Sequence, residues 1–508
     1  MKSNRNLSRA EGRRLGNVAL IAFMLGSLLL LSLVRAKFSP IGKTGDAIKA
    51  EEQQAMAKDS GEMATAHEAA AAEEEEDETR SKPTDSSSGS GGIGSTAIVA
   101  GDDHAERASK LVCYESSRRS DTCEAAGDVR VVGRAQTVLV SPLDREWKVK
   151  PYCRKNDAFA LSHVKEWTLR PAGSEDAPRC TVNSSATAFV LSTGGFTGNL
   201  FHDYTDVLIP AFITARRYGG DVQLLVSSYK PWWTTKYLQV LQQLSRHEVV
   251  DSDADAEVRC YPRVVVGPTF HRELGVDASL SPSSGGVSMP EFRAMLRDAF
   301  GLERAAAAPS GDRWDIRRRP RLLIISRRTS RLLLNERAMA DMATSLGFDV
   351  RTGDPEVSTD VARFARLVNS ADVMVGVHGD GLTNMVFLPA GAVLVQVVPY
   401  GGLEWLARGT FREPAEGMEV HYLEYVVQKD ETTLSEEYGE DDPVIRDPAA
   451  IHRQGWDTLK AVYLDKQNGV QPAQNVVESG DNKNAAARFR GSFVQEQRTV
   501  RDSVNCSS

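Results

Sequence analysis

The clearest pattern of apolar and polar positions lies between residues 373 and 399, which read VMVGVHGDGLTNMVFLPAGAVLVQVVP. A first apolar run ends at Val377, and the turn His-Gly-Asp-Gly follows at residues 378–381. A short helical segment is expected over residues 382–388, and a second apolar run covers residues 392–398. Strand, glycine-rich turn, helix and strand in this order predict half of a parallel α/β sheet, with the turn at the carboxyl end of a strand.

Similar patterns continue on both sides of this stretch. Apolar residues at spacings of three and four predict a helix over residues 200–218. Other runs predict short strands at residues 129–140, 188–192, 221–227, 264–267, 322–325 and 349–351, and helices at residues 289–300 and 361–371. Residues 422–427 and 436–442 and a helix-like stretch at residues 452–464 form a long extension. The alternation beyond an expected linker at residues 301–314 is typical of a Rossmann-like lobe.

The amino terminus has the pattern of a membrane anchor. Residues 17–34 carry no charge, and at about 1.5 Å per residue they nearly cross a hydrocarbon core of about 30 Å. A cleaved signal peptide is the alternative, but residues 34–37 offer a poor cleavage site. The basic cluster in residues 1–16 precedes the span, which predicts a cytosolic tail and a type II membrane protein with its remainder in a lumen.

Residues 35–110 lack hydrophobic periodicity and contain the acidic block EEEEDE and the run SSSGSGGIGS. Such a segment buries too little apolar surface to offset its ordering entropy. We expect a flexible stem, with a partner-binding tail as the alternative for the acidic block. The last residues, from 468 to 508, are polar and expected to be loose.

Length, charge and cysteine usage narrow the class of protein. A chain of 508 residues with 41% hydrophobic residues accommodates two packed domains, and a net charge of −8 gives no reason to expect nucleic acid binding. All six cysteines follow the expected anchor, and Cys113 with Cys123 is the favoured pair in an oxidising lumen. The absence of a CxxC motif argues against zinc and thioredoxin chemistry. Asn183 begins a glycosylation sequon, and Asn505 begins a weaker one.

Two groups of polar residues are candidates for chemistry. His202 and Asp206 are four apart on the helix that follows a glycine-rich loop, so they share a face and could act as a general base. We expect His202 to be the base and Asp206 to orient it, with Asp206 as the base in the alternative. A surface His–Asp pair is the alternative. Arg327, Arg328 and Arg331 follow a strand and could bind phosphate oxygens at the same sheet edge as the loop at residues 378–381. A solvated basic face is the alternative there.

Adjacent tryptophans follow the strand expected at residues 221–227. Trp232 and Trp233 could stack on a sugar ring, but core or interdomain packing is the favoured interpretation.

Six segments, taken together and in this order, resemble glycosyltransferase family 61, in particular its grass xylan-decorating members. They are GNLFHDYTDVLIPAFITARRYGG, QLLVSSYKPWW, RVVVGP, ISRRTSRLLLNE, GVHGDGLTNMVFLPAGAVLVQVVPYG and DDPVIRDP. The resemblance covers about residues 111–468. It implies a GT-B fold with two Rossmann-like lobes, which we place at residues 111–308 on the acceptor side and 309–467 on the UDP-sugar side.

The resemblance also implies site residues. The family's N-x-x-H-x-x-x-D pattern falls on Asn199, His202 and Asp206, and its arginine motif on Arg327, Arg328, Asn335 and Glu336. Its H-G-x-G-L-T-N loop falls on His378, Gly379, Asp380, Gly381, Leu382, Thr383 and Asn384. The chain departs from the family at Asp380, where a small residue is expected. A carboxylate is unfavourable beside a diphosphate unless it points away, caps the following helix or contacts the ribose.

The implied function is a Golgi glycosyltransferase that moves arabinofuranose or xylose from a UDP-sugar onto xylan by inversion, without a cofactor or a metal ion. A complex of Golgi glycosyltransferases is the expected protein partner. One alternative is a β-1,2-xylosyltransferase acting on N-glycan cores. Another is a non-catalytic scaffold of a polysaccharide-synthesising complex, which Asp380 motivates.

Overall fold

The computed structural model describes residues 111–467, apart from residues 142, 144, 173–176, 281–286, 308–318 and 356–359. The expected cytosolic tail, anchor and stem lie outside the described residues, as do the C-terminal tail, Cys506, the sequon at Asn505 and the second half of the expected linker. Within the part that is described, no helix is both long and apolar enough to cross a bilayer.

The first half of the described chain forms a mixed ten-stranded sheet. Its main path runs β4-β5-β3-β2-β10-β7-β8-β9, and β1 and β6 pair with β2 and β10. The strands β7, β8 and β9 and the pairing of β10 with β7 are parallel, whereas β2 is antiparallel to β1, β3 and β10. The strands are β1 (Leu111–Ser117), β2 (Ser120–Val132), β3 (Thr137–Ser141), β4 (Trp147–Val149), β5 (Trp167–Pro171), β6 (Val182–Asn183), β7 (Thr187–Ser192), β8 (Val222–Ser227), β9 (Val250–Asp251) and β10 (Val258–Val266).

The central strands of this sheet are covered on both faces, which explains their continuous apolar runs. Phe189 and Leu224 belong to an apolar core that includes residues of the helices, whereas their neighbours Val190 and Leu225 belong to a second core around Trp167. The helices are α3 (Ala158–Ser162), α4 (Leu200–His202), α5 (Ile209–Ala215), α6 (Pro231–Leu244) and α7 (Met289–Phe300). The helix expected at residues 289–300 is therefore confirmed.

One segment differs from its prediction. The run at residues 129–140 comprises the end of β2 and most of β3, joined by a 3-10 turn at Gly133–Ala135. A Cβ atom at Gly133 would overlap the main chain of Ser252. Because the strands on both sides of this turn are buried, the apolar pattern continues across it and hides the boundary.

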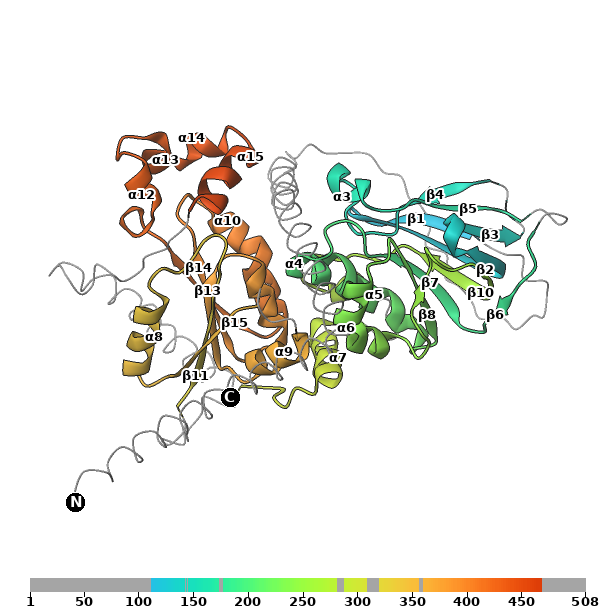
Figure 1. Ribbon diagram of the computed structural model, residues 1–508, viewed down its shortest axis with the longest axis horizontal. Coiled ribbons are helices and arrows are strands. Elements are labelled where there is room, and N and C mark those ends of the chain that lie inside the picture. Colours follow the sequence, from blue (N-terminus) through green and yellow to red (C-terminus); the bar gives the residue numbers. More distant parts are fainter. Residues whose placement is uncertain are drawn as a thin grey trace, which may run out of the picture. The chain divides into compact units, whose positions relative to one another are not determined.

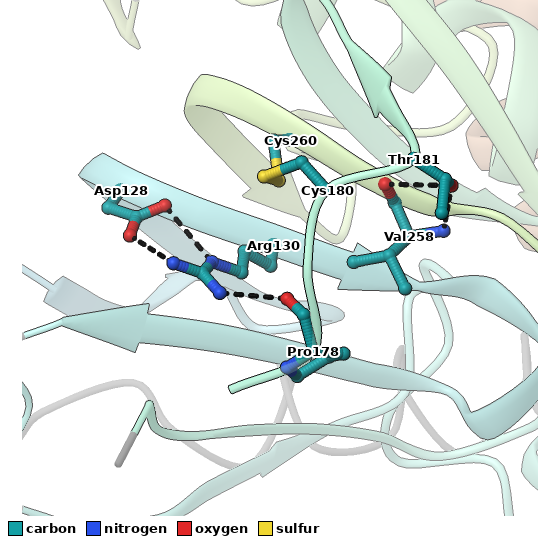
Figure 2. The surroundings of a disulfide bond; sticks show 7 residues. All are labelled: Asp128, Arg130, Pro178, Cys180, Thr181, Val258 and Cys260. Carbon is teal, nitrogen blue, oxygen red and sulfur yellow. Dashed lines mark hydrogen bonds and ion pairs between the residues drawn. A yellow bond between two sulfur atoms is a disulfide. The ribbon is translucent and has the colours of Figure 1, made fainter. Parts of the chain in front are cut away.

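Two disulfides are formed in the first sheet. Cys113 and Cys123 are bonded across the antiparallel pair β1–β2, as predicted. A second bond, which the sequence did not assign, joins Cys180 to Cys260 of β10 (Figure 2). Beside it, the Arg130 side chain donates a hydrogen bond to the carbonyl of Pro178 at 2.7 Å (Figure 2). This disulfide and this hydrogen bond both attach the segment before β6 to the sheet. The remaining described cysteine, Cys153, is buried and reduced.

The second half forms a five-stranded parallel sheet in the order β12-β11-β13-β14-β15. Its strands are β11 (Arg321–Ile325), β12 (Asp349–Gly353), β13 (Val373–Val377), β14 (Val393–Val398) and β15 (His421–Val426). Leu322 and Ile324 share a core with residues of α8 (Glu336–Ser345), whereas Leu323 and Ile325 share a core with residues of α9 (Val361–Asn369). The two helices therefore cover opposite faces of this sheet (Figure 1), as a Rossmann-like lobe requires.

Short helices follow β14 and β15. They are α10 (Glu404–Ala407), α11 (Glu413–Gly417), α12 (Leu434–Glu437), α13 (Pro443–Arg446), α14 (Pro448–His452) and α15 (Trp456–Leu459). The single helix expected at residues 452–464 is wrong, because Gly455, with φ of 97°, separates α14 from α15. A π-helical turn at Lys460–Asp465 ends the described chain.

Side chains from the two halves also meet in one apolar core. The rings of Tyr204, next to α4, and Phe387, before β14, meet edge to face with centroids 6.0 Å apart. The buried Arg293 of α7 donates hydrogen bonds to the carbonyls of Val386, Leu388 and Met418. The helix α7 is therefore bonded to main chain of the second half.

Candidate active site

The glycine-rich loop before α4 ends at Asn199, which begins the helix. The Asn199 side-chain oxygen accepts hydrogen bonds from the main-chain N–H groups of Phe201 and His202 at 2.9 and 3.4 Å. This is an N-cap, which satisfies donors that have no partner inside the helix. The amide oxygen of Asn199 thus has a capping role, and the predicted contact of this residue with substrate stays a prediction.

The predicted helix over residues 200–218 is confirmed, but it contains a π-helical turn at Asp203–Leu208. Such turns are often found at functional sites. Here the turn follows His202 and includes Asp206, and both side chains are fully buried with His202 Nδ1 2.5 Å from Asp206 Oδ2. The alternative of a surface His–Asp pair is wrong.

Two residues that sequence reasoning missed complete the surroundings of Asp206. The Tyr152 hydroxyl donates to Asp206 Oδ2 at 2.8 Å, and Arg154 Nε lies 3.2 and 3.1 Å from the two carboxylate oxygens. Arg154 also contacts Glu273 at 3.4 Å. Tyr152 and Arg154 come from the irregular segment between β4 and α3, about 50 positions before Asp206, so no local periodicity signals their role.

These contacts determine the protonation state and the tautomer of His202. Burial, together with the positive charges of Arg154 and Arg119, holds the pKa of His202 well below its usual value of 6.5. The ring is therefore neutral at physiological pH. Because Nδ1 faces a carboxylate, it carries the proton and Nε2 carries the lone pair. Both oxygens of Asp206 are engaged, so the basic atom of the pair is His202 Nε2.

The order of the second sheet locates a second candidate region. If its strands β11 to β15 are numbered 1 to 5 along the chain, they lie side by side in the order 2-1-3-4-5. In this arrangement the connections after the first and third strands leave in opposite directions, and ligands bind at that switch point. Here the loops after β11 and β13 meet there: Arg327 Nη1 lies 3.0 Å from Asp380 Oδ1. A Cβ atom on Gly379, whose φ is 149°, would overlap the Arg327 guanidinium. The arginine segment and the glycine turn are thus side by side, as expected.

Asp380 therefore does not cap the helix that follows it. Its carboxylate neutralises part of the charge of Arg327, which was expected to bind phosphate. The helical segment itself is a 3-10 helix at Asp380–Phe387, with no side-chain cap at Gly379.

His378 lies at the end of β13 and is held by a buried amide. Gln396 Nε2 lies 2.7 Å from His378 Nδ1, and the Tyr422 hydroxyl donates to Gln396 Oε1 at 2.9 Å. Burial and the charges of Arg331 and Arg327 lower the pKa of His378 well below 6.5. With Nδ1 accepting from Gln396, the neutral ring presents Nε2–H as a donor. Sequence reasoning missed Gln396 and Tyr422, which lie on neighbouring parallel strands.

The other predicted residues of this region differ in their surroundings. Arg328 is two-thirds exposed and pairs with Asp354, whereas Arg331 is buried with φ of 54°. Glu336 accepts a hydrogen bond from the Ser326 hydroxyl at 2.8 Å.

Four residues of the predicted loop and arginine motifs have different surroundings. The Leu382 side chain is fully buried in the apolar core, and its predicted role in substrate binding stays a prediction. Asn384 donates to the Gly381 carbonyl at 2.9 Å and so stabilises the turn. Among the described residues, the buried side-chain polar atoms of Asn335 and Thr383 Oγ1 have no hydrogen-bond partner. Such groups are costly unless a ligand satisfies them.

A row of aromatic contacts connects the two candidate regions. His378 meets Phe411 at a centroid distance of 5.6 Å, Phe411 meets Phe201 at 6.1 Å, and Phe201 meets His202 at 5.6 Å. The two histidines are thus separated by two phenylalanine rings. The arrangement can combine a general base in one half of the chain with anion-binding groups in the other.

Trp233 is fully buried and donates its indole N–H to Asp203 at 2.7 Å, which confirms the packing interpretation for this residue. Trp232 is half-buried beside the Lys230 ammonium group. Asn183, the sequon residue, is exposed in the short strand β6. In the described ranges, no group of three or more His, Cys, Asp or Glu residues could hold a metal ion.

The segment that contains both candidate regions also matches a known protein family. Residues 200–395, which include both histidines, match the family described as Glycosyltransferase 61. The chain is 43% identical to Alpha-1,3-arabinosyltransferase XAT3 of Oryza sativa subsp. japonica, over 72% of this chain and 64% of that protein. It is 38% identical to Beta-1,2-xylosyltransferase XYXT1 of the same organism, over 70% and 80%, and 33% identical to Xylan glycosyltransferase MUCI21 of Arabidopsis thaliana, over 72% and 77%. The match thus spans less than two thirds of the length of XAT3.

Proposed function

This chain belongs to glycosyltransferase family 61, and from that premise we propose that it transfers a pentose, arabinofuranose or xylose, from a UDP-sugar to xylan with inversion. Relatives named for arabinosyl and xylosyl transfer support the sugar class. The observation that carries the proposal is the buried His202–Asp206 pair, which provides a neutral base on the helix where the family match begins.

The fold proposed for this reaction is GT-B. Two separate sheets, of which the second is parallel and has its switch point between β11 and β13, support this assignment. The predicted lobe boundaries, 111–308 and 309–467, stay a prediction.

In the proposed mechanism, an acceptor hydroxyl of xylan gives its proton to His202 Nε2 as its oxygen attacks the anomeric carbon. The bond from that carbon to the UDP oxygen breaks on the opposite face, and UDP leaves with the electron pair. The Asp206 carboxylate lies against Nδ1 and stabilises the imidazolium that forms when the ring takes this proton. The Asp206 carboxylate is in turn fixed by Tyr152 and Arg154. Asp206 thus acts as a positioning residue and not as the base.

The leaving diphosphate would be stabilised by groups at the switch point. Arg327 and Arg331 supply positive charge, His378 supplies a neutral N–H donor, and the turn at residues 379–381 supplies main-chain N–H groups. The unsatisfied polar atoms of Asn335 and Thr383 fit contacts to the same ligand. Because Asp380 already pairs with Arg327, binding of UDP requires this ion pair to open or to shift. The reaction so described needs no metal ion.

We place the reaction in the Golgi lumen, behind a type II anchor at residues 17–34. The two disulfides support an oxidising compartment, and the exposed Asn183 suits a glycosylated site. Removal of N-glycans by a glycosidase should increase the electrophoretic mobility of the full chain, and Asn183→Gln should reduce that increase. An unchanged mobility would remove the support from glycosylation.

The test of function is transfer by the purified full-length chain. It is incubated in EDTA with xylo-oligosaccharides and, in separate reactions, with UDP-arabinofuranose and UDP-xylose, and the products are analysed by mass spectrometry. We expect the acceptor to gain one pentose with one of the two donors. Transfer only to N-glycan cores would support the alternative xylosyltransferase. Binding of UDP with transfer to none of these acceptors would support the scaffold, in which the Asp380–Arg327 pair blocks turnover.

A further inference from the structure

An exposed aromatic side chain lies near the candidate base. Phe159, on the short helix α3, is 42% exposed. Its ring stacks on that of Phe196, with centroids 5.9 Å apart and planes at 20°. A single exposed apolar side chain is ordinary on a protein surface. Phe159 is unusual because the ring on which it stacks, Phe196, contacts the candidate base.

Phe196 is connected to the His202–Asp206 pair in two ways. Its ring centroid lies 4.6 Å from that of His202. Its main-chain N–H donates to the Tyr152 hydroxyl at 3.0 Å, and that hydroxyl donates to Asp206 at 2.8 Å. The ring on which Phe159 stacks therefore contacts His202 directly and is linked to Asp206 through the Tyr152 hydroxyl.

The helix that carries Phe159 is fixed in place. Asp157 caps α3 by accepting from the Ala160 N–H at 2.8 Å. At the other end, a Cβ atom on Gly194 would overlap the carbonyl of His163, so α3 packs directly against the loop that leads to His202. The position of the Phe159 ring relative to this loop is thus set by close packing.

A second group near Phe159 can form hydrogen bonds. The exposed His163 ring lies 4.8 Å from the Phe159 ring, and its Nδ1 lies 3.0 Å from the Phe159 carbonyl. A carbonyl only accepts, so Nδ1 is the donor, and Nε2 is the ring nitrogen that can contact a ligand. An apolar ring with a polar ring nitrogen at its edge matches a sugar, which has C–H groups on its faces and hydroxyls around its rim.

We propose that Phe159 and His163 form an acceptor subsite, in which the Phe159 ring stacks on a pyranose of the xylan chain and His163 Nε2 forms a hydrogen bond with one of its hydroxyls. The subsite rests on the proposed function, since its occupant is the acceptor of that reaction. A rigid aromatic loses little entropy on binding. The bound chain would extend from this ring toward His202.

The test compares Phe159→Ala and Phe159→Tyr in the full-length chain, with xylohexaose as acceptor. Loss of one aromatic contact should raise the KM for xylohexaose about tenfold in the alanine variant, while the KM for the UDP-sugar stays unchanged. The tyrosine variant keeps the ring and should behave as the parent. The matched control is Tyr114→Ala, which removes an aromatic of 41% exposure from β1.

An unchanged KM for xylohexaose in Phe159→Ala, with transfer intact, would overturn the subsite while leaving the proposed function standing. If the parent chain transfers nothing, the proposed function fails, and calorimetric titration with xylohexaose then decides the subsite. Binding by the parent that is about tenfold weaker in Phe159→Ala would support it. Equal affinity in the two proteins, or no binding by the parent, would reject it.

Discussion

At the scale of single residues, the sequence predicted the two side chains of the candidate base. It did not predict the residues that position these side chains and change the pKa of His202. His202 and Asp206 share a helix, and their spacing alone places them on one face. Tyr152, Arg154 and Gln396 reach the histidines from other segments, and their contacts depend on how distant parts of the chain pack. Local periodicity contains no information on such packing. The protonation state of His202 could therefore be inferred only from the structure.

A prediction concerns the charge of Arg154. This guanidinium helps to lower the pKa of His202, so Arg154→Met should raise that pKa and move the acid limb of the pH profile of kcat/KM to higher pH. The parent should retain activity below pH 6.5, because its base stays neutral there. Removal of one partner of a buried ion pair should also lower the free energy of unfolding by about 3–5 kcal/mol.

The control for this variant is Arg246→Met, which removes an arginine that is 69% exposed and only weakly paired with Asp221. Its acid limb should coincide with that of the parent. An acid limb at the same pH in Arg154→Met would show that His202 does not titrate as the base.

At the scale of elements, the turn after β13 illustrates what a motif can predict. Its position at the carboxyl end of a strand and its closeness to the arginine segment followed from the expected parallel order of the sheet, and the structure confirms both. The ion pair between Asp380 and Arg327 could not be predicted, since it depends on side-chain directions in two loops. The broken helix at Gly455 was missed for a related reason: the apolar pattern continues on both sides of it.

Gly379→Ala tests the fit of these two loops. The added methyl group would overlap the Arg327 guanidinium, and φ of 149° is strained for alanine. We expect UDP binding, measured by calorimetry, to weaken at least about tenfold as Arg327 is displaced, with a loss of stability of about 1–3 kcal/mol. Gly347→Ala is the matched control: its φ is 96°, but nothing lies near its Cβ position. Equal UDP affinity in both variants would disprove the role of the Arg327–Gly379 contact.

At the scale of the whole molecule, the mixed α/β class was predicted and is confirmed. The parallel order of the second sheet followed from its alternating strands and helices. The order of the first sheet could not be predicted in this way, because the sheet contains both parallel and antiparallel pairs. In addition, its strand β10 pairs with β2, which is distant in the sequence. The apolar core shared by both halves was also not foreseen, since a linker in the sequence does not reveal how far the halves pack together.

Buried histidines give the stability of the molecule a pH dependence. The pKa values of His202, His271 and His378 are lowered in the folded protein, so below about pH 6.5 the unfolded chain binds protons that the folded chain does not. Stability from these groups is present above that pH and is lost as the pH falls. Each should remove up to about 1.4 kcal/mol per pH unit. Urea denaturation at pH 7.5 and 5.5 measures this loss, and His378→Gln should reduce it. Equal losses in the variant and the parent would contradict the lowered pKa of His378.

The most direct test of the account is the turnover of His202→Gln, measured in the full-length chain together with its affinity for UDP. Glutamine keeps a polar side chain but provides no base. We predict that kcat falls by about 10²–10⁴-fold while the Kd for UDP stays within about twofold of the parent value. His247→Gln, which breaks a half-exposed His–Asp pair with Asp221, is the control and should leave both quantities unchanged. Normal turnover by His202→Gln would contradict the assignment of His202 as the base.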